Sequence, residues 1–190
     1  QERRNFVPER IKIFDTVYTR LSDQAQYRFA ANKEAGKLLP DIINNPVQKV
    51  IKNTDISGVR RKQYHKKRNL GVVFSGGPAP GGHNVIAGLF DELKACNQDS
   101  CLFGFVLGSD GLLESRYVEI TQQMVDAHRN MGGFSMIKTG RTKIDTRQKM
   151  DQALKTCRSL DLEGLVIIGG DDSNTNAAFL AQHFSSAGIS

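Results

Sequence analysis

Short apolar runs and longer amphipathic stretches alternate along the second part of the chain. Four of the runs have the length and composition of strands, and most are typical of strands buried on both faces of a parallel sheet. They cover residues 70–74, 101–107, 117–120 and 164–168. The run at 101–107 leads into Gly-Ser-Asp-Gly at residues 108–111, for which we predict a turn.

The stretches between these runs repeat their apolar residues at helical spacing. Helices are therefore predicted through 85–93, after Thr121, after Asp145 or Thr146, and over 177–184. The threonines and the aspartate are suitable N-caps, because their side-chain oxygens can accept a hydrogen bond from a first-turn N–H group. Strands that alternate with helices form βαβ units. The sequence thus predicts an α/β fold with a doubly wound, Rossmann-like parallel sheet.

Residues 1–69 are predicted to form a basic and mainly helical extension. Apolar residues recur at helical spacing within 19–39, where Pro40 ends the pattern, and a shorter helix is expected over 46–52. The extension contains 16 Lys/Arg and 7 Asp/Glu, a net charge of +9, whereas the remainder contains 10 and 13, a net charge of −3. The basic stretch 53–69 is the expected boundary.

Charge and cysteine content narrow the range of partners. The densest basic run is Arg60–Arg68, but its single aromatic residue, Tyr64, favours a solvated linker or docking face over nucleic-acid binding. No apolar run is long enough to span a bilayer, and the first residues lack the apolar core of a secretory signal. Cys96, Cys101 and Cys157 have no metal-ligand spacing, which indicates reduced thiols. We therefore expect a cytoplasmic protein with no nucleic-acid and no membrane partner.

The most informative motif follows the strand predicted at 164–168. Residues 169–177 read Gly-Gly-Asp-Asp-Ser-Asn-Thr-Asn-Ala at a strand-to-helix turn. Glycines let a ligand approach the backbone, and the helix N-terminus offers N–H groups to anionic oxygens. Two adjacent carboxylates exceed what a helix cap needs, and they would repel bare phosphate unless a divalent cation bridged the two. The motif indicates metal-assisted phosphoryl chemistry.

Two further loops are candidates for phosphate contacts, because ligands of open parallel sheets bind beyond the carboxyl ends of the strands. Residues 75–84 contain four glycines and two prolines, and such a turn can cradle phosphate oxygens with its N–H groups or simply join a strand to a helix. The loop has neither the dinucleotide fingerprint nor a Walker lysine. Residues 138–143 supply cations, among them Arg141 with its planar fork, although alone they fit a solvated loop. His83 is expected to support the first loop by hydrogen bonding.

In combination and in this order, the segments 71–84, 139–143 and 169–177 resemble phosphofructokinases. They are most similar to the pyrophosphate-dependent branch, in its long form and catalytic-subunit type. The resemblance is close over residues 70–190, the N-terminal part of the donor-binding domain, and less specific over the extension. It implies a reversible glycolytic transfer of a phosphoryl group from pyrophosphate to the 1-hydroxyl of fructose 6-phosphate, with Mg²⁺, by a homo- or hetero-oligomer.

The resemblance also implies roles for individual residues. Gly77 matches the glycine that approaches the diphosphate, Asp171 the metal-linked aspartate, and Arg141 a basic phosphate contact. Asp172 stands where ATP-dependent relatives have glycine, so its carboxylate is expected to occupy the position of a nucleotide α-phosphate and to repel ATP. The other residues expected to contact pyrophosphate are Gly76, Gly81, Gly170 and Ser173.

One part of the family's pattern is missing. The catalytic base of the family lies in a Thr-Ile-Asp-Gly-Asp-like loop after the next strand, and the sequence stops before it. We therefore expect an N-terminal portion of the enzyme and no turnover by residues 1–190 alone. The alternatives are an ATP-dependent phosphofructokinase, a regulatory subunit that keeps the fold, and a dinucleotide-binding domain.

Overall fold

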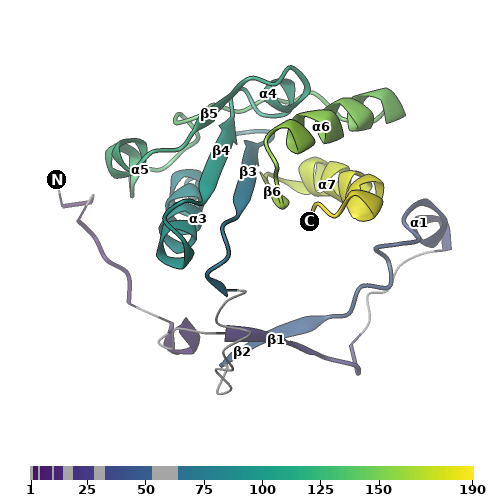
Figure 1. Cartoon of the computed structure of the whole chain (residues 1–190), viewed down its shortest axis with the longest axis horizontal. Helices are drawn as coiled ribbons and strands as arrows, with labels where there is room; N and C mark the ends of the chain where they lie inside the picture. The colour runs from purple at the N-terminus through teal and green to yellow at the C-terminus, as the bar shows by residue number, and fades with distance from the viewer. Residues whose placement is uncertain (1, 4, 10, 15–18, 28–32, 53–63) are drawn as a thin grey trace. The chain divides into compact units, whose positions relative to one another are not determined.

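The computed structural model describes all residues except 1, 4, 10, 15–18, 28–32 and 53–63. The chain forms two compact units, Val7–Lys66 and Lys67–Ser190, the latter together with Gln1–Phe6. A four-stranded sheet with helices on both faces makes up most of the second unit (Figure 1). Within the described part of the chain, every helix is too short or too polar to cross a bilayer.

The sheet has the strand order β5-β4-β3-β6 and is mixed rather than wholly parallel. Its central strand β3 (Asn69–Phe74) pairs in parallel with β4 (Cys101–Phe105) and with β6 (Gly164–Ile168), as the sequence predicted. The edge strand β5 (Tyr117–Glu119) instead runs antiparallel to β4. The reason is that the connection 106–116 is too short for the crossover that a parallel neighbour requires, about a dozen residues or more.

Helices cover the two faces of the sheet in separate layers (Figure 1). Val72 and Phe74 of β3 belong to a core that includes α3 (Gly82–Cys96) and α5 (Gln122–His128). Val73, between them, belongs to a second core with α6 (Arg147–Ser159) and α7 (Asp171–Phe184). Successive side chains of a strand point to opposite faces, so the uninterrupted apolar run of β3 supplies both cores.

The helix starts follow the predicted capping residues. The hydroxyl of Thr121 accepts a hydrogen bond from Met124 N at the start of α5, at 3.3 Å. Of the two candidates for α6, Thr146 is the N-cap, with its hydroxyl 3.3 Å from Lys149 N. The turn predicted at 108–111 is wrong, because a short helix, α4 (Ser109–Leu113), forms there. A 3₁₀ turn, η2 (Ser185–Ala187), follows α7.

The first unit contains strands where the sequence predicted helices. Strand β1 (Thr19–Asp23) lies where the helix over 19–39 was expected to begin, and among the described residues of that range helix is confirmed only at α1 (Lys33–Leu38). The helix expected over 46–52 is wrong, since β2 (Gln48–Lys52) pairs antiparallel with β1. A 3₁₀ turn, η1 (Lys12–Phe14), precedes β1.

Cross-strand pairing explains this error, because it joins residues far apart in the chain. Leu21 lies opposite Val50, and Gln48 Nε2 donates to Asp23 Oδ1 at 2.8 Å. The helical spacing of residues 21–30 depended partly on Phe29 and Ala30, which lie outside the described residues. The basic run 60–68 is likewise described only from residue 64 onward.

Candidate functional site

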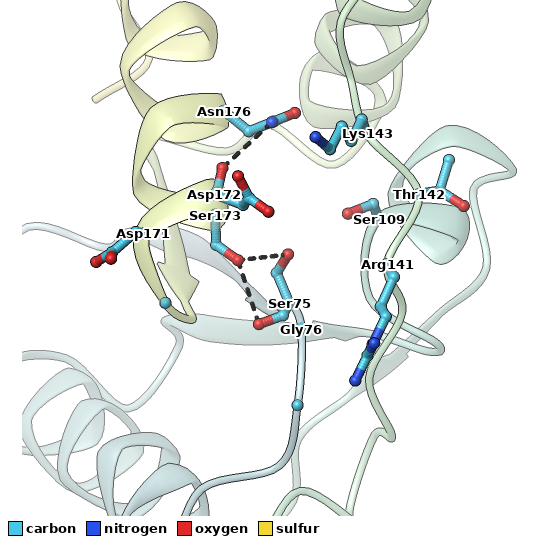
Figure 2. A pocket seen from close by; sticks show the side chains of 12 residues that line it. Ser75, Gly76, Ser109, Arg141, Thr142, Lys143, Asp171, Asp172, Ser173 and Asn176 are labelled. Atoms are coloured by element: carbon cyan, nitrogen blue, oxygen red, sulfur yellow. Dashed lines mark hydrogen bonds between the residues drawn. The ribbon is translucent and has the colours of Figure 1, made fainter.

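A cavity of about 630 Å³ lies where β3 and β6 end (Figure 2). The chain continues from β3 into α3 on one face of the sheet and from β6 into α7 on the other. Adjacent strands whose connections leave to opposite faces form the crevice in which open α/β sheets bind ligands. The cavity is lined by Ser75, Gly76, Gly77, Ser109, Arg141, Thr142, Lys143, Gly170, Asp171, Asp172, Ser173 and Asn176.

Hydrogen bonds join the three predicted loops to one another around this cavity. The buried hydroxyl of Ser173, in the first turn of α7, lies 2.9 Å from Ser75 Oγ and 3.3 Å from Ser75 O (Figure 2). Gly76 N donates to Gly140 O at 2.9 Å, and the Thr139 hydroxyl donates to Gly76 O at 2.8 Å. Segments that are far apart in the sequence therefore form one connected wall.

The glycine loop brings backbone close to the cationic side of the cavity. Gly76 has φ +89°, a conformation that L-residues with a side chain rarely adopt. A Cβ atom added at Gly77 would lie 3.8 Å from a terminal guanidinium nitrogen of Arg141. An anion held by the backbone of this loop would therefore be within reach of Arg141.

Two cations and two carboxylates line the cavity from opposite sides. Arg141 and Lys143 are exposed, and neither forms an ion pair within the described ranges. Asp172 points into the space between α7 and the 141–143 segment, whereas Asp171 points away from it on the other side of the helix start (Figure 2). The motif at 169–177 thus gives its two carboxylates different surroundings.

The carboxylates fit a cation that is shared with a phosphate rather than one enclosed by protein. Among the residues with described positions, no group of three or more His, Cys, Asp and Glu side chains is arranged to hold a metal ion. Mg²⁺ typically takes one or two carboxylates together with waters and substrate phosphates. Asp171 and Asp172, both exposed at the start of α7, provide a donor set of that kind.

Of the residues predicted to contact pyrophosphate or Mg²⁺, all but one line the cavity. Gly81 does not line the cavity; it is the N-cap of α3, and its carbonyl accepts hydrogen bonds from Asn84 N and Val85 N, each at 3.1 Å. Sequence reasoning missed Ser109 and Asn176. Ser109 could have been found, because it follows β4 at the same edge of the sheet.

His83, predicted to support the first loop by hydrogen bonding, is buried at the start of α3 and bonds instead to the segment that contains Met136. Its side chain is 1% exposed, and Nε2 accepts a hydrogen bond from Met136 N at 3.1 Å. Burial lowers the pKa of His83, and the neighbouring His128 lowers it further, against an opposing effect of the Gly132 backbone. Its Nδ1 is buried near that backbone without a hydrogen bond of good geometry to any described residue. The imidazole therefore acts as a neutral acceptor.

The three cysteines are free thiols and lie outside the cavity. Cys157 is fully buried in the core between α6 and the sheet, and burial raises its pKa to about 12. A thiol with so high a pKa stays protonated, so it is a poor nucleophile.

Comparison with known proteins identifies relatives of the whole second unit. The family model described as phosphofructokinase matches residues 69–189. The chain is 56% identical over 134 residues to pyrophosphate–fructose 6-phosphate 1-phosphotransferase of Porphyromonas gingivalis. The aligned region covers 70% of this chain and 24% of the relative. It is 41% identical over 185 residues to the enzyme of the same name from Entamoeba histolytica, covering 96% of this chain and 32% of the relative.

Solved structures agree with the fold. The pyrophosphate-dependent phosphofructokinase of Nitrosospira multiformis superposes with a TM-score of 0.57 at 17% identity, over 64% of this chain and 31% of that protein. At this identity the likeness concerns the fold alone. The chain spans a quarter to a third of the length of the two curated relatives, 24% and 32%.

Proposed function

We propose that this chain, which belongs to the phosphofructokinase family, forms the part of a pyrophosphate-dependent phosphofructokinase that binds the phosphoryl donor. The reaction would transfer a phosphoryl group from pyrophosphate to the 1-hydroxyl of fructose 6-phosphate. The observation that carries the proposal is one cavity that combines Arg141 and Lys143 with the paired carboxylates of Asp171 and Asp172. Two relatives named after this reaction, at 56% and 41% identity, support it.

In this proposal the donor is held by charge and by backbone N–H groups. Arg141 can bind two phosphate oxygens through its planar fork, and Lys143 adds a point charge. Gly76 and Gly77 leave room for the pyrophosphate beside the backbone, while Gly170 and Ser173 lie at the positive end of the α7 dipole. Phosphoryl transfer depends mainly on such positioning and charge stabilisation.

Asp171 is the residue that we propose as the Mg²⁺ ligand. When bound, Mg²⁺ would neutralise part of the charge on the pyrophosphate oxygens. Asp171 is exposed in the first turn of α7, so it can reach a cation that arrives together with its substrate. The requirement for a cation follows from the adjacent carboxylates, which alone would repel the tetra-anion.

Asp172 is the proposed donor selector. Its carboxylate points into the cavity (Figure 2), where it would meet the α-phosphate of a nucleotide but leave room for the shorter pyrophosphate. This argues against the alternative of an ATP-dependent phosphofructokinase. The retention of Arg141, Asp171 and Asp172 in one cavity likewise favours a catalytic over a regulatory subunit.

The wider assignments belong to the same proposal. Residues 70–190 are taken as the N-terminal part of the donor-binding domain, with residues 1–69 as an extension. The boundary at Lys66 and Lys67 between the two compact units supports this division, except that Gln1–Phe6 belong to the same unit as residues 67–190. Fructose 6-phosphate as acceptor, an oligomeric enzyme and a cytoplasmic location are predictions from the family.

Titration calorimetry with the 190-residue chain tests the proposal directly. We expect the chain to bind pyrophosphate in the presence of Mg²⁺ more tightly than it binds MgATP. Arg141→Ala should weaken pyrophosphate binding at least tenfold, the effect of losing a charge-assisted contact of about 1.5–3 kcal/mol. Arg158→Ala, an exposed arginine on α6, is the matched control and should bind normally. Preference for ATP, or binding that is insensitive to Arg141, would contradict the proposal.

A further inference from the structure

Asn176 joins the helix that carries both aspartates to the loop that carries the cations. It lies on α7, and both ends of its carboxamide are used. Its Oδ1 accepts a hydrogen bond from Ile144 N at 2.8 Å, and its Nδ2 donates to Asp172 O at 3.3 Å (Figure 2). The same side chain lines the cavity. One amide therefore connects the backbone of Asp172 with the end of the 141–143 segment.

The peptide group between Lys143 and Ile144 is held from two sides. Asn176 binds its N–H, while Lys149 Nζ, from α6, donates to its carbonyl, Lys143 O, at 2.8 Å. Ile144 is 3% exposed and packs into the core below. Because the N–H and the carbonyl of one peptide are both engaged, the plane cannot rotate without breaking one of these bonds.

This peptide sets the position from which Lys143 reaches into the cavity. Lys143 is exposed and its side chain has several rotatable bonds, so its backbone is the part that the fold can hold in place. Asp172 lies across the same space (Figure 2). The distance between the cationic segment and the carboxylate therefore depends on the Asn176 bridge.

We propose that Asn176 is a positioning residue for pyrophosphate: it holds the Arg141–Lys143 segment at a fixed separation from Asp172, so that the cations and the carboxylate act on the same anion. This inference rests on the proposed function. Only a carboxamide of this length both accepts from Ile144 N and donates to Asp172 O. Aspartate would keep the first bond, lose the second and add a negative charge to the cavity.

The test combines pyrophosphate binding with a local structural measurement on the 190-residue chain. Calorimetry with Mg²⁺ and pyrophosphate gives the affinity, and NMR-detected hydrogen exchange reports on the Ile144 amide. We expect Asn176→Ala to speed exchange at Ile144, because its N–H loses its acceptor. It should also weaken pyrophosphate binding roughly tenfold, the loss expected when the cationic segment no longer keeps one charge-assisted contact in place. Asn97→Ala, which removes an asparagine beyond the end of α3, is the matched control and should change neither quantity.

A second variant probes the same peptide from outside the cavity. Lys149→Met removes the bond to Lys143 O, and we expect it to weaken pyrophosphate binding by a smaller factor. In the double variant Asn176→Ala/Lys149→Met, we expect the fold loss of pyrophosphate affinity to be smaller than the product of the two single-variant losses. The reason is that both side chains hold the same peptide group. If Asn176→Ala does not fold, as judged by circular dichroism, Lys149→Met alone provides the test.

The outcomes separate this inference from the proposed function. If the wild-type chain does not bind pyrophosphate, the proposed function fails and the inference fails with it. If the wild type binds but Asn176→Ala binds equally well, or leaves exchange at Ile144 unchanged, only the inference is overturned. The inference would also be overturned if the affinity loss of the double variant equalled the product of the two single losses, since the two side chains would then act independently.

Discussion

Two adjacent aspartates at the start of α7 have different surroundings and, in our proposal, different tasks. Asp171 points away from the cationic segment and Asp172 points toward it (Figure 2). The resemblance to phosphofructokinases implied different roles for them, because it led us to expect glycine at the position of Asp172 in ATP-dependent members. Their directions follow from the helix, since neighbouring residues on a helix lie about 100° apart around its axis.

The proposed role of Asp172 predicts that its replacement changes the preference between pyrophosphate and ATP as donors. We expect Asp172→Gly to raise the affinity for MgATP about tenfold relative to that for magnesium pyrophosphate, because a carboxylate facing the α-phosphate is removed. Competition calorimetry with the two donors measures the ratio. Asp99→Gly removes an exposed carboxylate outside the cavity and should leave the ratio unchanged. An unaltered ratio in Asp172→Gly would remove the basis for its role as selector.

The backbone of the first loop supports another residue-level prediction. Gly76 has φ +89°, so Gly76→Ala should lower the free energy of unfolding by about 1–2 kcal/mol. Gly88 lies inside α3 with open space around it, and Gly88→Ala should raise the same quantity by about 0.5–1 kcal/mol. Urea unfolding of both variants measures the two changes. Equal effects of the same sign would show that the conformation of Gly76 is not strained for alanine.

At the scale of elements, the buried His83 links α3 to the segment that leads to Arg141. Its Nε2 can accept from Met136 N only while the ring is neutral, and the rings of Phe74 and His128 lie beside it. The pKa of His83 is lowered from 6.5 in the folded chain. Below pH 6.5 the unfolded state therefore binds more protons than the folded state. The contribution of neutral His83 to the free energy of unfolding is fully present above pH 6.5, and it is lost as the pH falls toward the folded pKa.

A comparison of pH profiles isolates the contribution of His83. Between pH 7 and 5 we expect the free energy of unfolding of the wild type to fall more steeply than that of His83→Gln, by at most about 1.4 kcal/mol per pH unit. Gln can still accept a hydrogen bond but does not titrate. Gln98→Ala, which changes a non-titrating side chain at an exposed position, should keep the wild-type slope. Identical slopes for wild type and His83→Gln would contradict the prediction.

The sequence predicted best those elements that depend on interactions between residues close together in the chain. Thr121 and Thr146 cap the helices that begin after them, because the hydrogen bond of an N-cap spans only three residues. Strand β1 was mistaken for the start of a helix, since its partner β2 lies nearly thirty residues away and leaves no periodic trace in 19–23. Whether β5 runs parallel or antiparallel to β4 depends on the length of the 106–116 connection, which is too short for a parallel crossover.

At the scale of the whole molecule, charge distribution makes the proposed anion site dependent on a cation. Residues 70–190 carry 10 Lys/Arg and 13 Asp/Glu, so this part of the chain has no general attraction for anions. Removing Mg²⁺ with EDTA should therefore weaken pyrophosphate binding by at least tenfold, because the negative charges of Asp171 and Asp172 at the start of α7 then repel the pyrophosphate anion uncompensated. Calorimetry before and after restoring Mg²⁺ measures the effect. Binding that is independent of divalent cations would exclude the role proposed for Asp171.

The sequence by itself predicted the strands of the second unit and its longer helices, though not α4 or the direction of β5, and it located the three loops that meet at the cavity. It could do so because apolar periodicity, glycines and caps are local properties of the chain. The tertiary structure alone decided that Gly81 lies outside the cavity, that Asn176 lines it, and that Asn176 holds the Ile144 peptide. Those relations depend on how strands order in a sheet and which loops then meet, and contacts between residues so far apart leave no pattern along the chain.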